Sequence, residues 1–326
     1  MANGFTTIGT QDVNVLISAI NQKLNTEMKA ADSVYRKVCL VDSTSNAKFE
    51  HYTMNVTAYS IREQLAYTAA TFSKPEVVDI VVSATDFRSP IQMASLGAFD
   101  DPYGIIERAA QDNLKSAMRQ WEILLAELIN ANGTWNGDGL PFFGTHNTNP
   151  GVPGRPTFNN ALTATPPNKA GFLKAFNTLQ NVVGFDNRRL FPDLDMTREV
   201  VCVVPNLDMY VSLAEVLHAG MTAQPVGAGA AASTDTRLVN YAKNIVVLPE
   251  LQDPRYPDSS NTWYMICTGY ATRPAFIMRD YKQPRFKYVP ENSWLDHQFM
   301  AHGFIVESAG GAGFGLPQSV VRCRTF

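Results

Sequence analysis

Residues 101–133 read DPYGIIERAAQDNLKSAMRQWEILLAELINANG, and this stretch decides what kind of fold the chain can adopt. Apolar residues recur at intervals of three and four, with charged residues between them, which is typical of an amphipathic helix. Pro102 suits the first turn of a helix, and Asn132-Gly133 suits its end. The pattern predicts one helix over 102–132, about 45 Å long at 1.5 Å per residue. A rod of that length exceeds the core of a compact domain, so we expect a flat or elongated subunit.

Two strand-like segments precede this helix. Residues 48–60 (KFEHYTMNVTAYS) and 77–84 (VVDIVVSA) are rich in aromatic and β-branched residues, whereas 61–74 between them is polar and small. The pattern predicts an extended hairpin that projects from the body and takes its stability from neighbouring subunits, because two strands alone are marginally stable. An ordinary surface hairpin with a disordered tip is the alternative.

Residues 11–31 carry apolar residues at helical spacing and predict an amphipathic helix of about five turns. Its apolar stripe must be covered, either by its own domain or by a neighbouring subunit, and the pattern does not distinguish the two.

The remaining pattern mixes helices and strands without a regular strand–helix–strand rhythm, which predicts an α+β fold. A helix is expected over 166–183, a buried strand over 200–204 and a helix directly after it. Further strands are expected at 245–248, 263–268, 286–289 and 298–307. The glycine clusters at 227–233 and 310–315 lack the context of a nucleotide-binding motif and are interpreted as loops.

The amino-acid composition argues against several classes of protein. The 326 residues include 27 Lys and Arg against 30 Asp and Glu, a net charge of −3, which argues against a dedicated nucleic-acid binder. The length suggests about two domains or one large interrupted domain. Four dispersed cysteines do not form a disulfide scaffold, and neither a secretory signal nor a membrane-spanning stretch is recognisable.

Motifs for catalysis or metal binding are absent from the sequence: it has no HExxH, CxxC or GxSxG, and no glycine-rich phosphate loop. We therefore predict no catalytic, cofactor-binding or metal-binding residues and no enzymatic activity. The best candidate for a catalytic base is His146, near Asp138 in the loop 136–150, and we expect it to hold that loop together. A soluble α+β enzyme using this loop is the alternative from a different functional class.

The order of five segments resembles a known family. These segments are VDSTSNAKFEHY (41–52), NGDGLPFFGTHNTNP (136–150), VVCVVPNLDMYVSLAEVL (200–217), WYMICTGYATRPAFIMRDYKQPRF (263–286) and HGFIVESAGGAGFGLPQSVV (302–321). Together they resemble the major capsid proteins of tailed bacteriophages, specifically the Mu-like major head subunit family, which has the Hong Kong ninety-seven capsid fold.

The resemblance implies a division of the chain. Residues 1–46 would form an N-terminal arm, and 47–84 an extended loop that reaches over a neighbouring subunit. Residues 85–165 and 286–306 would form a peripheral domain containing the spine helix 102–132. Residues 166–285 and 307–326 would form an axial domain.

The resemblance also implies the function. The chain would assemble into the hexamers and pentamers of an icosahedral shell that encloses double-stranded DNA, with other copies of itself as its main partners. Portal, scaffold and decoration proteins are further partners in that setting, DNA would be a weakly contacted cargo, and no membrane is involved. The protein would reside in the virion, and in the host cytoplasm before assembly. An encapsulin-type shell is the alternative within the same fold.

Under this reading the hairpin of one subunit lies across the spine helix of the next, with charge pairs that fix the register. The residues expected to form this inter-subunit contact are Arg62, Glu63 and Lys74 on the hairpin and Arg108, Asp112, Lys115, Arg119 and Glu122 on the helix.

Overall fold

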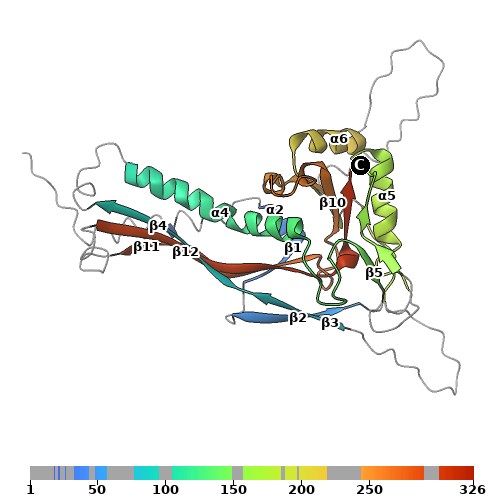
Figure 1. The fold of residues 1–326 in the computed structure, drawn as a ribbon, viewed down its shortest axis with the longest axis horizontal. Coiled ribbons are helices and arrows are strands. Elements are labelled where there is room, and N and C mark those ends of the chain that lie inside the picture. The colour runs from blue at the N-terminus through green and yellow to red at the C-terminus, as the bar shows by residue number, and fades with distance from the viewer. Residues whose placement is uncertain are drawn as a thin grey trace, which may run out of the picture.

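The computed structural model describes residues 33–43, 48–56, 77–94, 105–148, 157–184, 188–196, 198–218, 244–289 and 301–326, together with Ser18, Asn21, Gln22 and Thr26. These residues form an elongated α+β molecule (Figure 1). A long helix lies along a long sheet, and a second sheet with its own helices gathers at one end, where the C-terminus also lies. The α+β class expected from the sequence is confirmed.

The long sheet has four strands in the order β1-β11-β12-β4. Its centre is the antiparallel pair β11 (Phe276–Val289) and β12 (Ala301–Phe314), each 14 residues long. Strand β4 (Thr85–Ala94) pairs antiparallel with β12, and β1 (Cys39–Asp42) pairs parallel with β11. The short helix α2 (Val34–Val38) leads directly into β1.

The long helix is α4 (Ile105–Ala131), 27 residues and about 40 Å in length. It confirms the helix predicted over 102–132, whose first residues lie outside the described part of the chain. Asn132 follows with a φ of 45°, the left-handed conformation that commonly ends a helix. Trp121, Leu125 and Ile129 are almost fully buried on one face of α4. These three residues are spaced four apart, so the apolar stripe of the sequence is the face that packs on the protein.

The second sheet has five strands in the order β7-β13-β10-β8-β9. Its central strand β10 (Thr262–Cys267) and its neighbour β8 (Val200–Val204) are buried along their whole length, which explains their unbroken apolar sequences. The other strands are β7 (Ala161–Leu162), β9 (Ile245–Val247) and the C-terminal β13 (Val320–Arg324). Helices α5 (Lys169–Gln180) and α6 (Leu207–His218) accompany this sheet, close to the positions expected for them.

The predicted hairpin is present as a two-stranded ribbon of β2 (Phe49–Asn55) and β3 (Val77–Ser83), which pair antiparallel from Phe49–Ser83 to Asn55–Val77. Along β3 buried and exposed residues alternate: Val78, Ile80 and Val82 face the protein core. The described part of the hairpin therefore packs on its own chain, and the expectation that it projects from the body and depends on neighbouring subunits for its stability is wrong for these residues. The segment that joins the two strands lies outside the described residues. A shorter ribbon, β5 (Thr145–Asn147) with β6 (Thr157–Asn159), follows α4.

The interpretation of residues 310–315 as a loop is wrong, because Gly310, Gly311 and Gly313 lie within strand β12. A β-carbon on Gly310 would collide with the ring of Trp121 on α4, and one on Gly311 would collide with the carbonyl oxygen of Ser83. Glycine is therefore required here because the long helix and the ribbon both approach this part of the sheet closely. The other glycine cluster, 227–233, lies outside the described residues.

The division into a peripheral and an axial domain, expected from the sequence, stays a prediction. Strands β11 and β12 run without interruption through residues 285/286 and 306/307, where the peripheral and axial domains were expected to divide.

The helix expected over 11–31 also stays a prediction, because the structure describes only four positions of it, all helical. One of them, Asn21, accepts a hydrogen bond from the backbone N–H of Phe286 and donates one to its carbonyl oxygen, at 2.8 and 3.1 Å. Within one chain, Asn21 therefore contacts β11.

Candidate assembly surface

The charged residues of α4 divide into two kinds. Asp112 and Lys115 have side chains that are 80% and 75% exposed and stand 3.9 Å apart, a weak contact between neighbours on one helix. Both are thus available to a second subunit. Of the other residues expected at this contact, the side chain of Arg108 and all of Arg62, Glu63 and Lys74 lie outside what the structure describes.

Arg119 and Glu122 instead have partners within their own chain. Arg119 forms an ion pair with Glu250, which follows β9 and is only 8% exposed; the hydrogen bond between them raises the pKa of the Arg119 guanidinium. Glu122 accepts a hydrogen bond of 3.0 Å from the backbone N–H of Val34 at the start of α2. Burial raises the pKa of Glu122, and the Val34 N–H opposes this shift. These two residues hold α4 to the rest of the subunit.

The outward face of the β2–β3 ribbon is apolar in part. Phe49 is 58% exposed, Val77 53% and Val81 41%, and all three belong to the side of the ribbon that faces away from the core. On the same side His51 Nδ1 lies 2.9 Å from the Asp79 carboxylate, both largely exposed. Valine and phenylalanine on the outer side of a ribbon are the residues that a second protein surface would bury.

A buried arginine attaches the ribbon to the long sheet. Arg279 of β11 is 1% exposed, and its Nη1 donates hydrogen bonds of 3.1 and 3.0 Å to the carbonyl oxygens of Lys48 and Val82. At the other end of the ribbon, Arg273 donates to the carbonyl oxygens of Asn55 and Leu190. These contacts attach both ends of the described ribbon to the body. Sequence patterns did not single out either arginine, since a lone arginine in an apolar segment carries no motif.

A second charged cluster lies on the long sheet. Glu307 of β12 accepts hydrogen bonds from Lys282, Lys287 and Arg285 of β11; the two lysine contacts are 2.7 Å. Burial alone would raise the pKa of Glu307, but these three hydrogen bonds outweigh it and lower the pKa to about 2. Arg88 of β4 stands opposite Glu307 in the strand register and is exposed. This face of the sheet therefore carries more positive than negative charge.

The loop that follows α4 is held together by contacts of buried side chains. His146 is fully buried; its Nδ1 lies 2.7 Å from Asp138 Oδ2, and its Nε2 lies 3.0 Å from the carbonyl oxygen of Phe142. Its ring stacks on Phe158 and meets the edge of Trp135. Both ring nitrogens have partners inside the protein, so His146 is placed to hold the loop together and not to take a proton from a substrate.

Asn160 adds three hydrogen bonds to the same region. Its side-chain amide donates to the carbonyl oxygens of Phe142 and Pro317 and accepts from the backbone N–H of Gly144, all at 2.8 to 3.0 Å. Trp135 adds a hydrogen bond of 2.8 Å from its indole N–H to the carbonyl oxygen of Gly315. The end of α4 and the end of β12 are thereby tied together between the two sheets.

The described residues form neither a metal-binding cluster nor a reactive thiol. No three His, Cys, Asp or Glu side chains gather among these residues as metal ligands. All four cysteines are free, and burial raises the pKa of Cys202 and of Cys267 to about 12, so both are protonated thiols near neutral pH. Within the same residues, no helix combines the length and the apolar character that crossing a bilayer requires.

Comparison with known proteins identifies the fold as that of tailed-phage capsids. The chain is similar in structure to the mature capsid of bacteriophage PhiM1, with a TM-score of 0.55 and 12% identity over 90% of this chain and 87% of that one. It is similar to the capsid of cyanophage P-SCSP1u, with a TM-score of 0.51 and 12% identity over 90% and 88%. No protein-family model matches the chain, and no curated protein matches its sequence.

A third similar structure is the capsid of a native GTA particle, with a TM-score of 0.50 and 10% identity over 89% of each chain. In all three cases about nine-tenths of the chain is matched. The capsid fold implied by the five sequence segments is therefore confirmed.

Proposed function

We propose that this chain is the major capsid protein of a tailed bacteriophage, which assembles into hexamers and pentamers of an icosahedral shell around double-stranded DNA. The observation that carries the proposal is the capsid fold over 90% of the chain. Its role is then structural, and its working surfaces are contacts between copies of the chain.

The exposed surfaces support this proposal. Phe49, Val77 and Val81 lie on the outward face of the ribbon, where another subunit can cover them. Leu207 and Val211, which lie one turn apart on α6 and are 67% and 46% exposed, form a second apolar surface. A monomer gains nothing from leaving these residues in water, whereas their burial between subunits would contribute about 25 cal/mol per Å².

The proposal assigns the parts of the chain as follows. Residues 1–46 act as the arm and 47–84 as the extended loop; 85–165 and 286–306 form the peripheral domain, and 166–285 with 307–326 form the axial domain. Asp112 and Lys115 on α4 contact the loop of a neighbouring subunit. The proposal places the protein in the virion, and in the host cytoplasm before assembly.

Further partners belong to the same proposal: a portal, and scaffold or decoration proteins. The packaged DNA is a weakly held cargo, as the net charge of −3 favours. If so, binding of the purified shell protein to DNA will be weak, and it will disappear with moderate salt.

Sedimentation of the purified full-length chain tests the proposal. We expect closed particles of megadalton mass, seen also by electron microscopy, in equilibrium with a small folded subunit. The matched variants are Val77→Ser with Val81→Ser, which remove apolar area from the outward ribbon face, and Thr53→Ser on the same face. The double variant should stay as folded subunits, and Thr53→Ser should assemble. Wild-type protein that remains small under all assembly conditions would contradict the proposal.

A further inference from the structure

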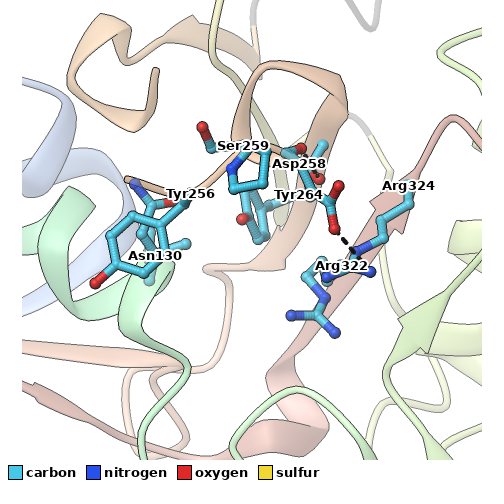
Figure 2. Close-up of a pocket in the computed structure, with 10 residues that line it drawn as sticks. Asn130, Tyr256, Asp258, Ser259, Tyr264, Arg322 and Arg324 are labelled. Atoms are coloured by element: carbon cyan, nitrogen blue, oxygen red, sulfur yellow. Dashed lines mark hydrogen bonds and ion pairs between the residues drawn. The ribbon is translucent and has the colours of Figure 1, made fainter. Parts of the chain in front are cut away.

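A cavity of about 130 Å³ lies between the last turn of α4, the segment that precedes β10, and the strands β10 and β13. It is far larger than the roughly 10–15 Å³ that one water molecule needs. Figure 2 shows Arg322 and Arg324 extending from β13 on one side of this cavity, and Asn130 and Tyr256 on the other. Neither arginine formed part of any site expected from the sequence.

The two arginines share one face of β13 because they are two residues apart on a strand. The guanidinium carbon of Arg322 stands 5.1 Å from the centre of the Phe143 ring, which supports one of its faces. Arg324 Nη1 lies 3.1 Å from the Asp258 carboxylate, which is half exposed at the edge of the cavity. Both side chains are thus held in place by neighbours while they line the cavity.

Their hydrogen bonding is incomplete. The Nε atoms of Arg322 and of Arg324 are both buried, and neither has a hydrogen-bond partner among the described residues. Leaving a buried donor without an acceptor costs about 1–3 kcal/mol, and more for a charged group. Because both Nε atoms are closed off from solvent, the donors that an ion in the cavity would meet are the terminal Nη groups of the two arginines.

The charges of the cavity are also unbalanced. Its lining residues include two arginines and one carboxylate, that of Asp258, which leaves one positive charge in excess. Burial, and after it the charge of Arg324, lower the pKa of Arg322, as expected where a counter-ion would be favourable. The phenol of Tyr256, the hydroxyl of Ser259 and the amide of Asn130 add neutral polar groups at the same cavity.

We propose that this cavity binds a small oxyanion with the size and charge of inorganic phosphate, held by the N–H groups of Arg322 and Arg324. A guanidinium presents N–H donors in a planar fork, which fits the spacing of oxygens in such an ion. The ion would join the end of α4 to the five-stranded sheet, so its binding should stabilise the joint between the two halves of the subunit. This inference is independent of the proposed function.

Thermal unfolding of the purified full-length chain tests the site, with sodium phosphate titrated against sodium chloride at constant ionic strength. Phosphate also stabilises proteins generally by exclusion from their surface, an effect that does not saturate. We therefore expect a saturable rise in the melting temperature on top of that general effect. Arg322→Gln should abolish the saturable part, and Arg322→Lys, which keeps the charge but loses the fork, should weaken phosphate binding at least tenfold.

The matched control is Arg285→Gln. Arg285 is an arginine of β11 that pairs with Glu307 on the long sheet and does not line the cavity, so its variant should keep the full saturable response. Because Arg322→Gln can lower the stability of the subunit by itself, Arg324→Gln and isothermal titration with phosphate at a temperature well below unfolding provide second readings. An equal response of the wild type and both cavity variants, or no saturable response in the wild type, would overturn the proposal.

Discussion

His146 illustrates how the same residue supports two readings until its contacts are known. A histidine beside an aspartate in a conspicuous loop is the pattern of a catalytic base, and it is equally the pattern of a structural hydrogen bond. Here the ring is fully buried, with Asp138 on one nitrogen and the Phe142 carbonyl oxygen on the other. The sequence was enough to predict that His146 and Asp138 lie together. The structural role of His146 follows only from its burial and from its second hydrogen-bond partner, which is a backbone atom.

Replacing His146 by phenylalanine should destabilise the subunit by about 2–3 kcal/mol, because the Asp138 carboxylate, only 5% exposed, would lose its contact with the imidazole and keep only the hydrogen bond from the Leu140 N–H. The midpoint of urea unfolding measures this. The control is His51→Ala, which breaks the 2.9 Å contact with Asp79 in a setting where both side chains are more than half exposed. That variant should stay within about 0.5 kcal/mol of the wild type. Equal effects of the two substitutions would argue against the structural role of His146.

Glu307 gives the long sheet a pH dependence. Its pKa falls from an ordinary 4.5 to about 2 in the folded protein, so its contribution to stability is fully present above pH 4.5 and is lost as the pH falls toward 2. Glu307→Gln should lower stability at pH 7 by about 1 kcal/mol, since its three partners are partly exposed. It should also flatten the loss of stability between pH 4.5 and 2. Acid unfolding curves with the same slope in both proteins would contradict this.

At the scale of elements, local patterns predicted what local forces determine. The long helix, the ribbon and the buried strand β8 each follow from the spacing of their apolar residues. Strand β4 and the glycine-rich half of β12 were missed because neither carries strand-forming residues in a recognisable pattern. Their backbone is held in a sheet by partners distant in the sequence, and β12 is glycine-rich because Trp121 and Ser83 leave no room for side chains.

Gly311→Ala tests that explanation. The added β-carbon would meet the carbonyl oxygen of Ser83, a backbone atom that cannot turn away, so the ribbon must separate from β12 or the subunit must unfold. We expect a loss of at least 2 kcal/mol in unfolding free energy. Gly144→Ala is the control, because its β-carbon meets its nearest neighbour, the Pro141 carbonyl oxygen, at 3.4 Å. If Gly311→Ala were as stable as Gly144→Ala, the close approach of ribbon and sheet would be wrong.

Different charged residues of α4 should affect assembly and subunit stability. Reversing Asp112 and Lys115 together should leave the unfolding free energy within about 0.5 kcal/mol of the wild type, because both are exposed and pair only weakly with each other. If these charges contact a neighbouring subunit, the yield of assembled particles should fall. Reversing Arg119 instead should lower the stability of the subunit itself, because Glu250 would face a like charge. Normal assembly of the Asp112–Lys115 variant would exclude this part of α4 from the contact.

At the scale of the whole molecule, the elongated shape comes from elements that are longer than one compact domain. The long helix and the two 14-residue strands extend away from the five-stranded sheet (Figure 1), and the exposed faces of the helix and of the ribbon carry charged and apolar residues. The order of five segments along the sequence was enough to predict the fold. It could not predict where β11 and β12 run from one half of the molecule into the other, since strand length depends on pairing between distant segments.

An electron cryo-microscopy reconstruction of particles formed by the full-length chain tests the proposed function most directly. We expect closed shells in which Val77 and Val81 on the outward face of the ribbon are covered by a neighbouring copy. The proposal would be contradicted by protein that forms no shells, or by shells in which this face of the ribbon is open to solvent.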